Sequence, residues 1–437
     1  MLSILIVLSL VPEEPVALES LGRALFMPAP RAGSRVVATS AYVEPTGGAM
    51  MSLHWWQSRS DKFDIAHRRF SGDHGRSWSE PDIVWTHKQV EGGTLRRTER
   101  VPLLDLGTGV LLTFILQGVL PGDDPLDGMR HWNLRYTLSR DGGRSTFHEG
   151  PVVHVGEEYD ESHPLPGVWI GRNSVMIGDA SCRPIRRHDG AILQPVQITP
   201  LGPDGVAHNP GGGYTFHDAA VLIGRDNGEG TLDWTLSSRV EGDAARSTRG
   251  WIEPTLAQVE DGRILMLLRG SNDVRPLLPG YRWRSVSEDG GESWSDPRPW
   301  ADDQGQALHS PSSCSQLLLH SSGRLLWIGN LCPVNPRGNH PRHPLVIAEV
   351  DRESLNLIAD TVCSIDRREE GDPERLQLSN FLALEDRRSG DVLIHLSPLG
   401  RGHDVLQPDP GSGFDWTANA WLYRVRVGVP DAPSPSP

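Results

Sequence analysis

The chain has 437 residues, more than one ordinary hydrophobic core holds. Its 37% of hydrophobic residues, 47 glycines and 35 prolines favour short strands separated by many turns over long helices. The formal net charge of −14 excludes nucleic acid and anionic membrane surfaces as partners, but it permits an anionic substrate, because a local arginine cluster can dominate a pocket.

An apolar run at residues 2–11 (LSILIVLSLV) is the first predicted element. A signal peptide would carry basic residues before this run and a small-residue cleavage site after it, but neither is present and VPEEP follows. The run is also too short to span a membrane as a helix. We therefore interpret it as a first β-strand. We favour a cytoplasmic location slightly over secretion and leave the location open.

A motif of the form S-x-D-x-G-x-x-W recurs along the chain. Clear copies begin at Ser71 (SGDHGRSW), Ser139 (SRDGGRSTF, with the aromatic residue one place late) and Ser287 (SEDGGESW). Weaker echoes include Asp226 and Asp351, so that successive aspartates are 68, 85, 63 and 62 residues apart. In each copy the Ser and Asp side chains can bond backbone amides of a hairpin turn, and the glycines accept positive φ. We interpret the motif as structural, with one copy for each small sheet.

A second pattern, a tight turn followed by an apolar strand, has the same period. It occurs six times, at residues 32–37, 107–112, 189–193, 261–265, 322–326 and 389–393. Two patterns with one period predict an all-β, six-bladed β-propeller, because sheets closed in a ring leave few exposed edges. We expect a single domain over residues 1–429, closed by pairing between the N-terminal strand and residues 421–427, and a disordered tail at 430–437.

Four cysteines, at positions 182, 314, 332 and 363, show neither a CxxC pair nor zinc spacing. We interpret them as ordinary buried thiols. Since no spacing of His and Asp residues is specific enough for a metal site, we predict no metal and no cofactor.

The repeated motif, its number of copies and their order resemble the bacterial sialidases and their wider superfamily. The likeness extends to residues 253–269 (EPTLAQVEDGRILMLLR), where a Glu opens an inner strand and an Arg follows. Residues 189–195 (DGAILQP) and 379–384 (SNFLAL) resemble strands of the family's third and last blades. The likeness covers roughly residues 20–427 and implies a six-bladed propeller with a pocket at the mouth of its central channel.

In that family three arginines hold the carboxylate of a sialic acid, a Tyr assisted by a Glu is the nucleophile, and an Asp is the general acid and base. The resemblance assigns Glu253 to the family's Glu and Arg269 to one of the arginines. Arg342 matches the region of the third arginine, with Arg337 as a competing position. Asp61 lies nearest to the place expected for the Asp.

Two positions of the family are not matched. The first arginine is expected at Phe26, which leaves Arg31, Arg35 or Arg100 as substitutes. Arg100 opens an R-V-P triplet in the second blade and could point its charge into the channel mouth. The nucleophilic tyrosine is expected at Leu378.

Other polar and aromatic residues in predicted mouth loops complete the candidate site. Of the six tyrosines, Tyr214 and Tyr281 are the loop candidates for a nucleophile. The run HWW at residues 54–56 leads us to expect substrate contacts from His54 and Trp55, because an indole can stack on a sugar face.

These residues favour an exo-glycosidase of the sialidase type, which hydrolyses a terminal acidic sugar from a glycan. In this hypothesis Glu253 performs or assists nucleophilic attack, Asp61 protonates the leaving oxygen, and the arginines hold the acid. One alternative is a polysaccharide lyase acting on a uronate, with a loop His or a Tyr as the base. Another is a non-catalytic carbohydrate-binding propeller, which three departures from the family's pattern favour: the first arginine, the tyrosine and the position of the acid. The sugar, the linkage, the stereochemical outcome and the oligomeric state stay open.

Overall fold

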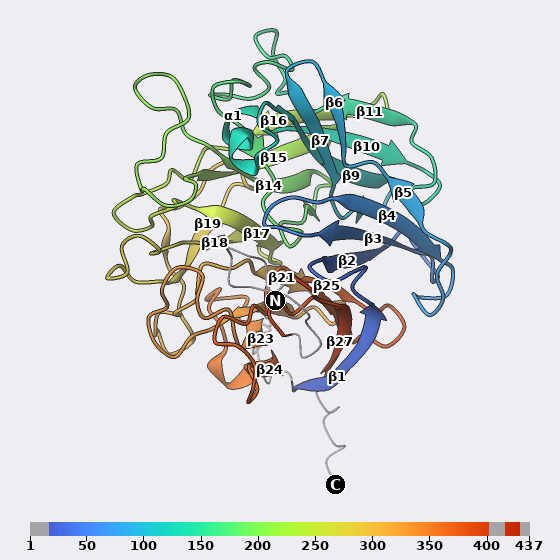
Figure 1. The fold of residues 1–437 in the computed structure, drawn as a ribbon, viewed down its shortest axis with the longest axis vertical. Helices are drawn as coiled ribbons and strands as arrows, with labels where there is room; N and C mark the ends of the chain where they lie inside the picture. Colours follow the sequence, from blue (N-terminus) through green and yellow to red (C-terminus); the bar gives the residue numbers. More distant parts are fainter. Residues whose placement is uncertain (1–16, 402–415, 429–437) are drawn as a thin grey trace, which may run out of the picture.

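The computed structural model describes residues 17–401 and 416–428, in which six antiparallel sheets surround a common centre (Figure 1). The strands β2, β17, β21 and β25 lie nearest to this centre, and each stands at one edge of its sheet. The predicted all-β, six-bladed propeller is therefore confirmed. The apolar run at residues 2–11 and the tail at 430–437 lie outside the described residues.

The first three blades follow each other along the chain. Blade one contains β2 (Arg35–Tyr42), β3 (Met50–Gln57), β4 (Ile65–Ser71) and β5 (Asp82–Val84). Blade two contains β6 (His87–Val90), β7 (Gly93–Glu99), β8 (Leu103–Leu104), β9 (Leu111–Leu120), β10 (Asn133–Ser139) and β11 (His148–Pro151), with the short helices η1 (Pro125–Asp127) and α1 (Gly128–His131) after β9. Blade three contains β12 (Val175–Met176), β13 (Ile185–Arg186), β14 (Ile192–Ile198), β15 (Asp218–Asp226) and β16 (Leu232–Leu236).

The last three blades have four strands each. Blade four contains β17 (Ile252–Gln258), β18 (Ile264–Arg269), β19 (Arg282–Ser287) and β20 (Arg298–Pro299). Blade five contains β21 (Gln316–Leu319), β22 (Leu325–Asn330), β23 (Leu345–Val350) and β24 (Cys363–Asp366), with the helix η2 (Ala359–Thr361) before β24. Blade six contains β25 (Leu382–Glu385), β26 (Val392–Leu396), β27 (Ala420–Val427) and β1 (Leu18–Met27).

The ring is closed by pairing between the two ends of the described chain. Strand β1 pairs antiparallel with β27, from Leu18 opposite Val427 to Met27 opposite Ala420. Pairing with the final strand was expected, and residues 18–27 form the pairing strand. Phe26 consequently lies on the outermost strand of blade six, and the inner strand of blade one begins only at Arg35.

The repeated Ser-Asp motif has the structural role predicted for it. In the first copy Ser71 Oγ accepts the N–H of Gly75 at 2.9 Å, while Asp73 accepts the N–H of Ser77 at 2.9 Å and its hydroxyl at 2.7 Å. The copies at Ser139 and Ser287 repeat these bonds. Each motif thus fixes the tight turn between the last two strands of a blade.

Large apolar side chains fill the spaces between neighbouring blades. Four tryptophans, Trp234, Trp251, Trp300 and Trp327, are among the largest fully buried side chains. Trp300 of blade four meets Trp327 of blade five edge to face, with ring centroids 5.2 Å apart, and its indole N–H donates to Leu355 O at 2.8 Å. Among the described residues no helix has the length and hydropathy needed to cross a membrane.

The inner strand of blade three is interrupted, which opens room for polar groups at the ring's centre. Both β12 and β13 pair with β14, and residues 177–184 between them leave the sheet. This loop carries Gly178 and Asp179 into the cavity described below.

The interface between blades four and five can be tested through Trp300. We expect Trp300→Ala to lower the free energy of unfolding by about 3–5 kcal/mol, because it removes a fully buried ring and a satisfied hydrogen bond. Denaturant unfolding followed by circular dichroism measures this loss. Trp85→Ala is the control, since Trp85 is 42% exposed and should change the stability little. Equal effects of the two substitutions would contradict the packing described here.

Candidate active site

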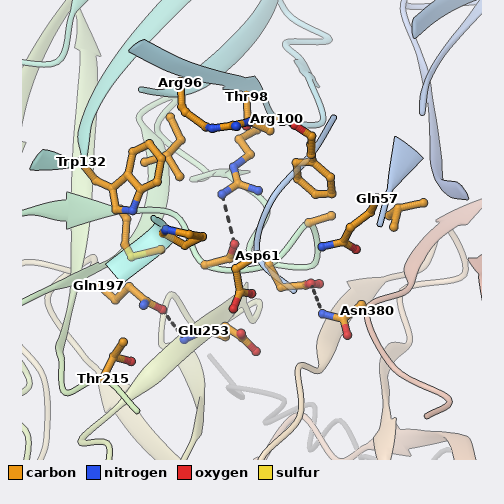
Figure 2. A pocket seen from close by; sticks show the side chains of 18 of the residues that line it. Gln57, Asp61, Arg96, Thr98, Arg100, Trp132, Gln197, Thr215, Glu253 and Asn380 are labelled. Carbon is orange, nitrogen blue, oxygen red and sulfur yellow. Dashed lines mark hydrogen bonds between the residues drawn. The ribbon is translucent and has the colours of Figure 1, made fainter. Parts of the chain in front are cut away.

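A cavity of about 190 Å³ lies at the centre of the ring, and blades one, two, three, four and six contribute to its lining. Figure 2 shows side chains from these blades converging on it, among them Asp61, Arg100, Glu253 and Asn380. These residues belong to strand ends or loops on one face of the ring. The described residues therefore form a single polar site that several blades share, as the resemblance implied.

Glu253 lies at the start of the inner strand of blade four and has a positive φ, which is unusual for a residue other than glycine. Its φ is 49°, and the pairing of β17 with β18 shifts register between Ile252 and Thr255. A hydrogen bond to blade three stabilises this strained conformation, because the N–H of Glu253 donates to Gln197 Oε1 at 3.0 Å. A Cβ at Gly178 would lie 2.6 Å from Glu253 Cγ, so this close approach requires glycine at position 178.

The two carboxylate oxygens of Glu253 differ in their hydrogen bonds. Oε1 accepts a hydrogen bond from Arg269 Nη1 at 2.5 Å, whereas Oε2 is buried and has no hydrogen-bond partner among the described residues. Burial raises the pKa of Glu253, but the charge and the hydrogen bond of Arg269, together with the charges of Arg342 and Arg249, outweigh it and hold the pKa below its ordinary value. Glu253 is therefore ionised, with one oxygen still able to accept a bond.

Arg269 and Arg342 lie behind Glu253 and not on the surface of the cavity. Arg269 is the last residue of β18, is 6% exposed, and also donates to Ser312 Oγ at 2.9 Å. Arg342 is 8% exposed and donates to Ser312 O at 2.9 Å and to Gln377 Oε1 at 2.9 Å. The two arginines thus meet at Ser312 and support Glu253. That they contact a substrate directly stays a prediction.

Four other arginines line the cavity itself. One of them, Arg96, forms an ion pair with Asp123, with 2.6 Å between Arg96 Nε and Asp123 Oδ1. The other three have uncharged partners. Arg35, the first residue of β2, donates to Gln57 Oε1 at 2.6 Å. Arg100 donates to the carbonyl oxygens of Ile177 and Gly178, the latter at 3.1 Å, and Arg249 donates to Thr215 Oγ1 at 2.7 Å.

All the hydrogen-bond acceptors of these three arginines are uncharged, and none of the three forms an ion pair with a described residue. Burial lowers the pKa of both Arg35 and Arg249 to about 10, so both stay charged at neutral pH. The cavity therefore presents three arginine charges that form no ion pair with a described acidic residue.

Asp61 and Tyr214 stand together on the lining of the cavity. Asp61 lies in the loop between β3 and β4 with φ 57°, and its Oδ2 accepts from the hydroxyl of Ser60 at 3.0 Å. Burial, the charges of Asp61 and Asp124, and a hydrogen bond to Asp61 raise the pKa of Tyr214 to about 12. Tyr214 is 51% exposed, so the pair has access to solvent. The phenol is consequently a proton donor at neutral pH.

Asp179 and Asn380 join blades three and six, which face each other across the ring. Asn380 Nδ2 donates to Asp179 Oδ2 at 2.7 Å, a bond drawn in Figure 2 between residues 201 positions apart in sequence. Leu378 is fully buried in the apolar core shared by blades five and six, and its N–H donates to Arg342 O at 2.9 Å. Blade six therefore presents Asn380 to the cavity, and the position expected to carry a tyrosine faces away from it.

The remaining predicted residues occupy three different places. Trp55 lines the cavity and stacks on Phe63 with centroids 5.4 Å apart. His54 is outside the cavity lining, because neighbouring residues of a strand point to opposite faces of the sheet. Arg337 is exposed in the loop between β22 and β23, also outside the lining. Within the described ranges no cluster of three or more His, Cys, Asp or Glu side chains is placed to hold a metal ion.

Several lining residues carry no signal in the sequence. Asp179 and Gln197 belong to no repeated motif, and Arg249 stands in a loop before β17. The sequence offers Arg35 only as a substitute, because the resemblance places the first arginine at Phe26, which lies on β1 and not on the inner strand of blade one. The pairing of β1 with β27, a contact between the two ends of the described chain, is what gives Arg35 its inner position.

Comparison with known proteins agrees with this architecture. Residues 55–361, more than half of the chain, match the BNR repeat-like domain, and the chain belongs to that family. Among solved structures, a protein of unknown function from Dyadobacter fermentans has a TM-score of 0.56 at 16% identity and covers 95% of this chain and 100% of its own. An intramolecular trans-sialidase from Ruminococcus gnavus has a TM-score of 0.55 at 12% identity and covers 93% of this chain and 97% of its own.

An α-L-arabinanase from Penicillium chrysogenum is also similar, with a TM-score of 0.51 at 13% identity over 93% of this chain and 98% of its own. No curated protein matches the chain. At these identities the likeness shows the fold alone. The protein is a sialidase-like BNR propeller in its architecture.

The buried pair of Glu253 and Arg269 generates a prediction about pH. Glu253→Gln should lower the free energy of unfolding at pH 7 by about 3–5 kcal/mol, because Arg269 then stays buried without its counter-ion. Since the pKa of Glu253 is lowered in the folded protein, the stabilisation is complete above the unfolded value, near 4.5, and is lost as the pH falls through the folded value.

Denaturant unfolding of both proteins from pH 7 down to acid pH measures this difference, which should shrink only below about pH 4.5. Glu260→Gln is the matched control, because the Glu260 side chain is 83% exposed in its pair with Arg352. A difference between wild type and Glu253→Gln that stays constant with pH would contradict the ion pair.

Proposed function

We propose that this protein is a glycoside hydrolase that removes a terminal acidic sugar from a glycan. The observation that carries the proposal is the set of three cavity-lining arginines, Arg35, Arg100 and Arg249, whose charges no described acidic group pairs. Partly buried charges without counter-ions are costly, so an anionic ligand is strongly favoured at such a place. A planar guanidinium binds a carboxylate with two parallel hydrogen bonds, which suits a sugar acid.

The shape of the cavity supports action at the end of a glycan chain. Its volume of about 190 Å³ corresponds to roughly six water molecules at liquid density, which is room for a single sugar residue. Asp179 and Asn380 bond to each other across the centre of the ring. A glycan that enters with its terminal residue would therefore find the way through the ring obstructed at that point.

Two carboxylates are available for the bond cleavage. In the proposed reaction Asp61 gives a proton to the glycosidic oxygen as the bond from that oxygen to the anomeric carbon breaks. Glu253, whose Oε2 has no described partner, attacks the anomeric carbon or assists the attacking group. Water finally supplies the hydroxyl of the released sugar and returns the proton to Asp61.

A lyase reaction is the second candidate, and one observation favours it. Tyr214 and His217 both line the cavity beside Arg249. His217, whose pKa is lowered to about 3 by burial, is neutral and can remove the proton next to a uronate carboxylate once arginines neutralise that carboxylate. The Tyr214 phenol can then donate a proton to the leaving oxygen. The two reactions leave different products, since elimination creates a double bond that absorbs in the ultraviolet and hydrolysis does not.

The first test concerns the two carboxylates. We expect Glu253→Gln and Asp61→Asn each to lower kcat on a chromogenic acidic glycoside by about 10²–10⁴-fold, the usual contribution of a general acid or base. Asp64→Asn is the matched control, because Asp64 lies in the same loop, bonds Ser58 Oγ at 2.7 Å and is outside the cavity lining. Full activity of Glu253→Gln would refute the hydrolase proposal, and an ultraviolet-absorbing product would replace it with the lyase.

The second test concerns the arginines. Arg100→Gln and Arg249→Gln should each reduce kcat/KM for an acidic glycoside by roughly 10–100-fold, because each removes a charge-assisted hydrogen bond worth about 1.5–3 kcal/mol. The corresponding neutral glycoside should lose much less. Arg97→Gln is the control, since Arg97 pairs with Glu149 and lies outside the cavity lining. Equal losses on acidic and neutral glycosides would contradict recognition of a carboxylate.

A further inference from the structure

A second hollow lies where blade six meets blade one, apart from the axial cavity. Its volume is about 370 Å³, and its lining shares no residue with that of the axial cavity. One wall is the segment 27–30 at the end of β1, which is rich in proline, and the other wall comes from β3 and β4. His54, which the sequence places next to the candidate substrate-binding Trp55, belongs to this second hollow.

Arg69 supplies a positive charge to the hollow without a described partner. It lies on β4, and its guanidinium carbon is 5.5 Å from the ring centroids of both Phe26 and Trp78. Its Nε and Nη2 are buried and have no hydrogen-bond partner among the described residues. Burial lowers the pKa of Arg69, and no acidic group counteracts this effect. The two aromatic faces attract the cation but accept none of its hydrogen bonds.

In the described part of the chain, histidine side chains, and not carboxylates that would balance the charge of Arg69, lie around its guanidinium group. His54 is 3% exposed and stacks on His67, which is 8% exposed, with centroids 5.0 Å apart. The Nδ1 atoms of both rings are buried and have no partner among the described residues, and the same holds for Nδ1 of His395. Burial and the charge of Arg69 lower the pKa of all three histidines, so the rings are neutral at pH 7 and Arg69 is the cation of this cluster.

We propose that the hollow between blades six and one binds an oxyanion, a carboxylate, sulfate or phosphate group, with Arg69 as its cation. Arg69 offers buried N–H groups that no described acceptor satisfies, and the one N–H of each neutral imidazole can add a donor beside it, which suits such a group. The proline-rich wall and Trp56 add an apolar surface beside the charge, on which a sugar ring that carries the acid can lie. This site is independent of the proposed reaction, because its residues do not line the axial cavity.

The test uses a parent in which the axial cavity is weakened, the double variant Arg35→Gln/Arg100→Gln. Sodium sulfate and, separately, sodium glucuronate are titrated at constant ionic strength while the melting temperature is recorded. We expect the parent to show a saturable rise with either anion, because a ligand that binds only the folded state stabilises it. Adding Arg69→Gln should raise the midpoint concentration at least tenfold, which is about 1.4 kcal/mol of binding free energy.

Arg69→Lys and His67→Phe are second variants in case Arg69→Gln does not fold, and each should weaken binding while keeping a bulky side chain at its position. A lower midpoint for glucuronate than for sulfate identifies an acidic sugar as the ligand, and equal midpoints identify the bare oxyanion. In the wild-type background Arg69→Gln should leave kcat/KM on a small glycoside unchanged. A saturable rise in melting temperature with the same midpoint in the presence and absence of Arg69 would overturn the proposal. This outcome does not depend on whether the protein hydrolyses a glycoside.

Discussion

The ion pair of Glu253 with Arg269 is the interaction around which the centre of the ring is organised. The arginines that are buried deeply enough for burial to act on their pKa include the seven residues Arg35, Arg100, Arg183, Arg249, Arg269, Arg282 and Arg342. Glu253 is the carboxylate whose charge acts on most of them, and Arg269 holds it at 2.5 Å. Because buried charge without compensation is so costly, this pair makes the remaining excess of positive charge tolerable.

The ring geometry explains how such a site can exist in a stable fold. The core between blades four and five, which contains Trp300 and Trp327, is formed without any residue of the cavity. The axis is therefore left for features that reduce stability locally, among them the positive φ of Glu253 and of Asn380 and the interrupted inner strand of blade three. Apolar packing between neighbouring blades stabilises the fold. Strained and charged groups lie at the axis, where all the blades meet.

The sequence predicted the ring far better than the site. The six repeats and the turn motifs follow from local patterns, because each blade repeats the same short-range interactions. The bond between Asp179 and Asn380 joins opposite blades, and no spacing along one strand contains that information. His54 and Trp55 show the same limit at short range, since one strand carries both and the face each occupies depends on the strand's register in the sheet.

The charges around the cavity offer an explanation for the leucine at position 378, where the resemblance places a tyrosine. A tyrosine nucleophile avoids repulsion between an attacking carboxylate and the carboxylate of an acidic sugar. Here Leu378 is part of the core, and Asp179, Glu253 and Asp61 are the acidic groups that line the cavity. The five arginines at 35, 100, 249, 269 and 342 exceed these three acids in number, so a carboxylate can face an anionic substrate without net repulsion. In the proposed hydrolase, the surplus of arginine charge therefore takes the place of a neutral nucleophile as the means of accommodating an acid.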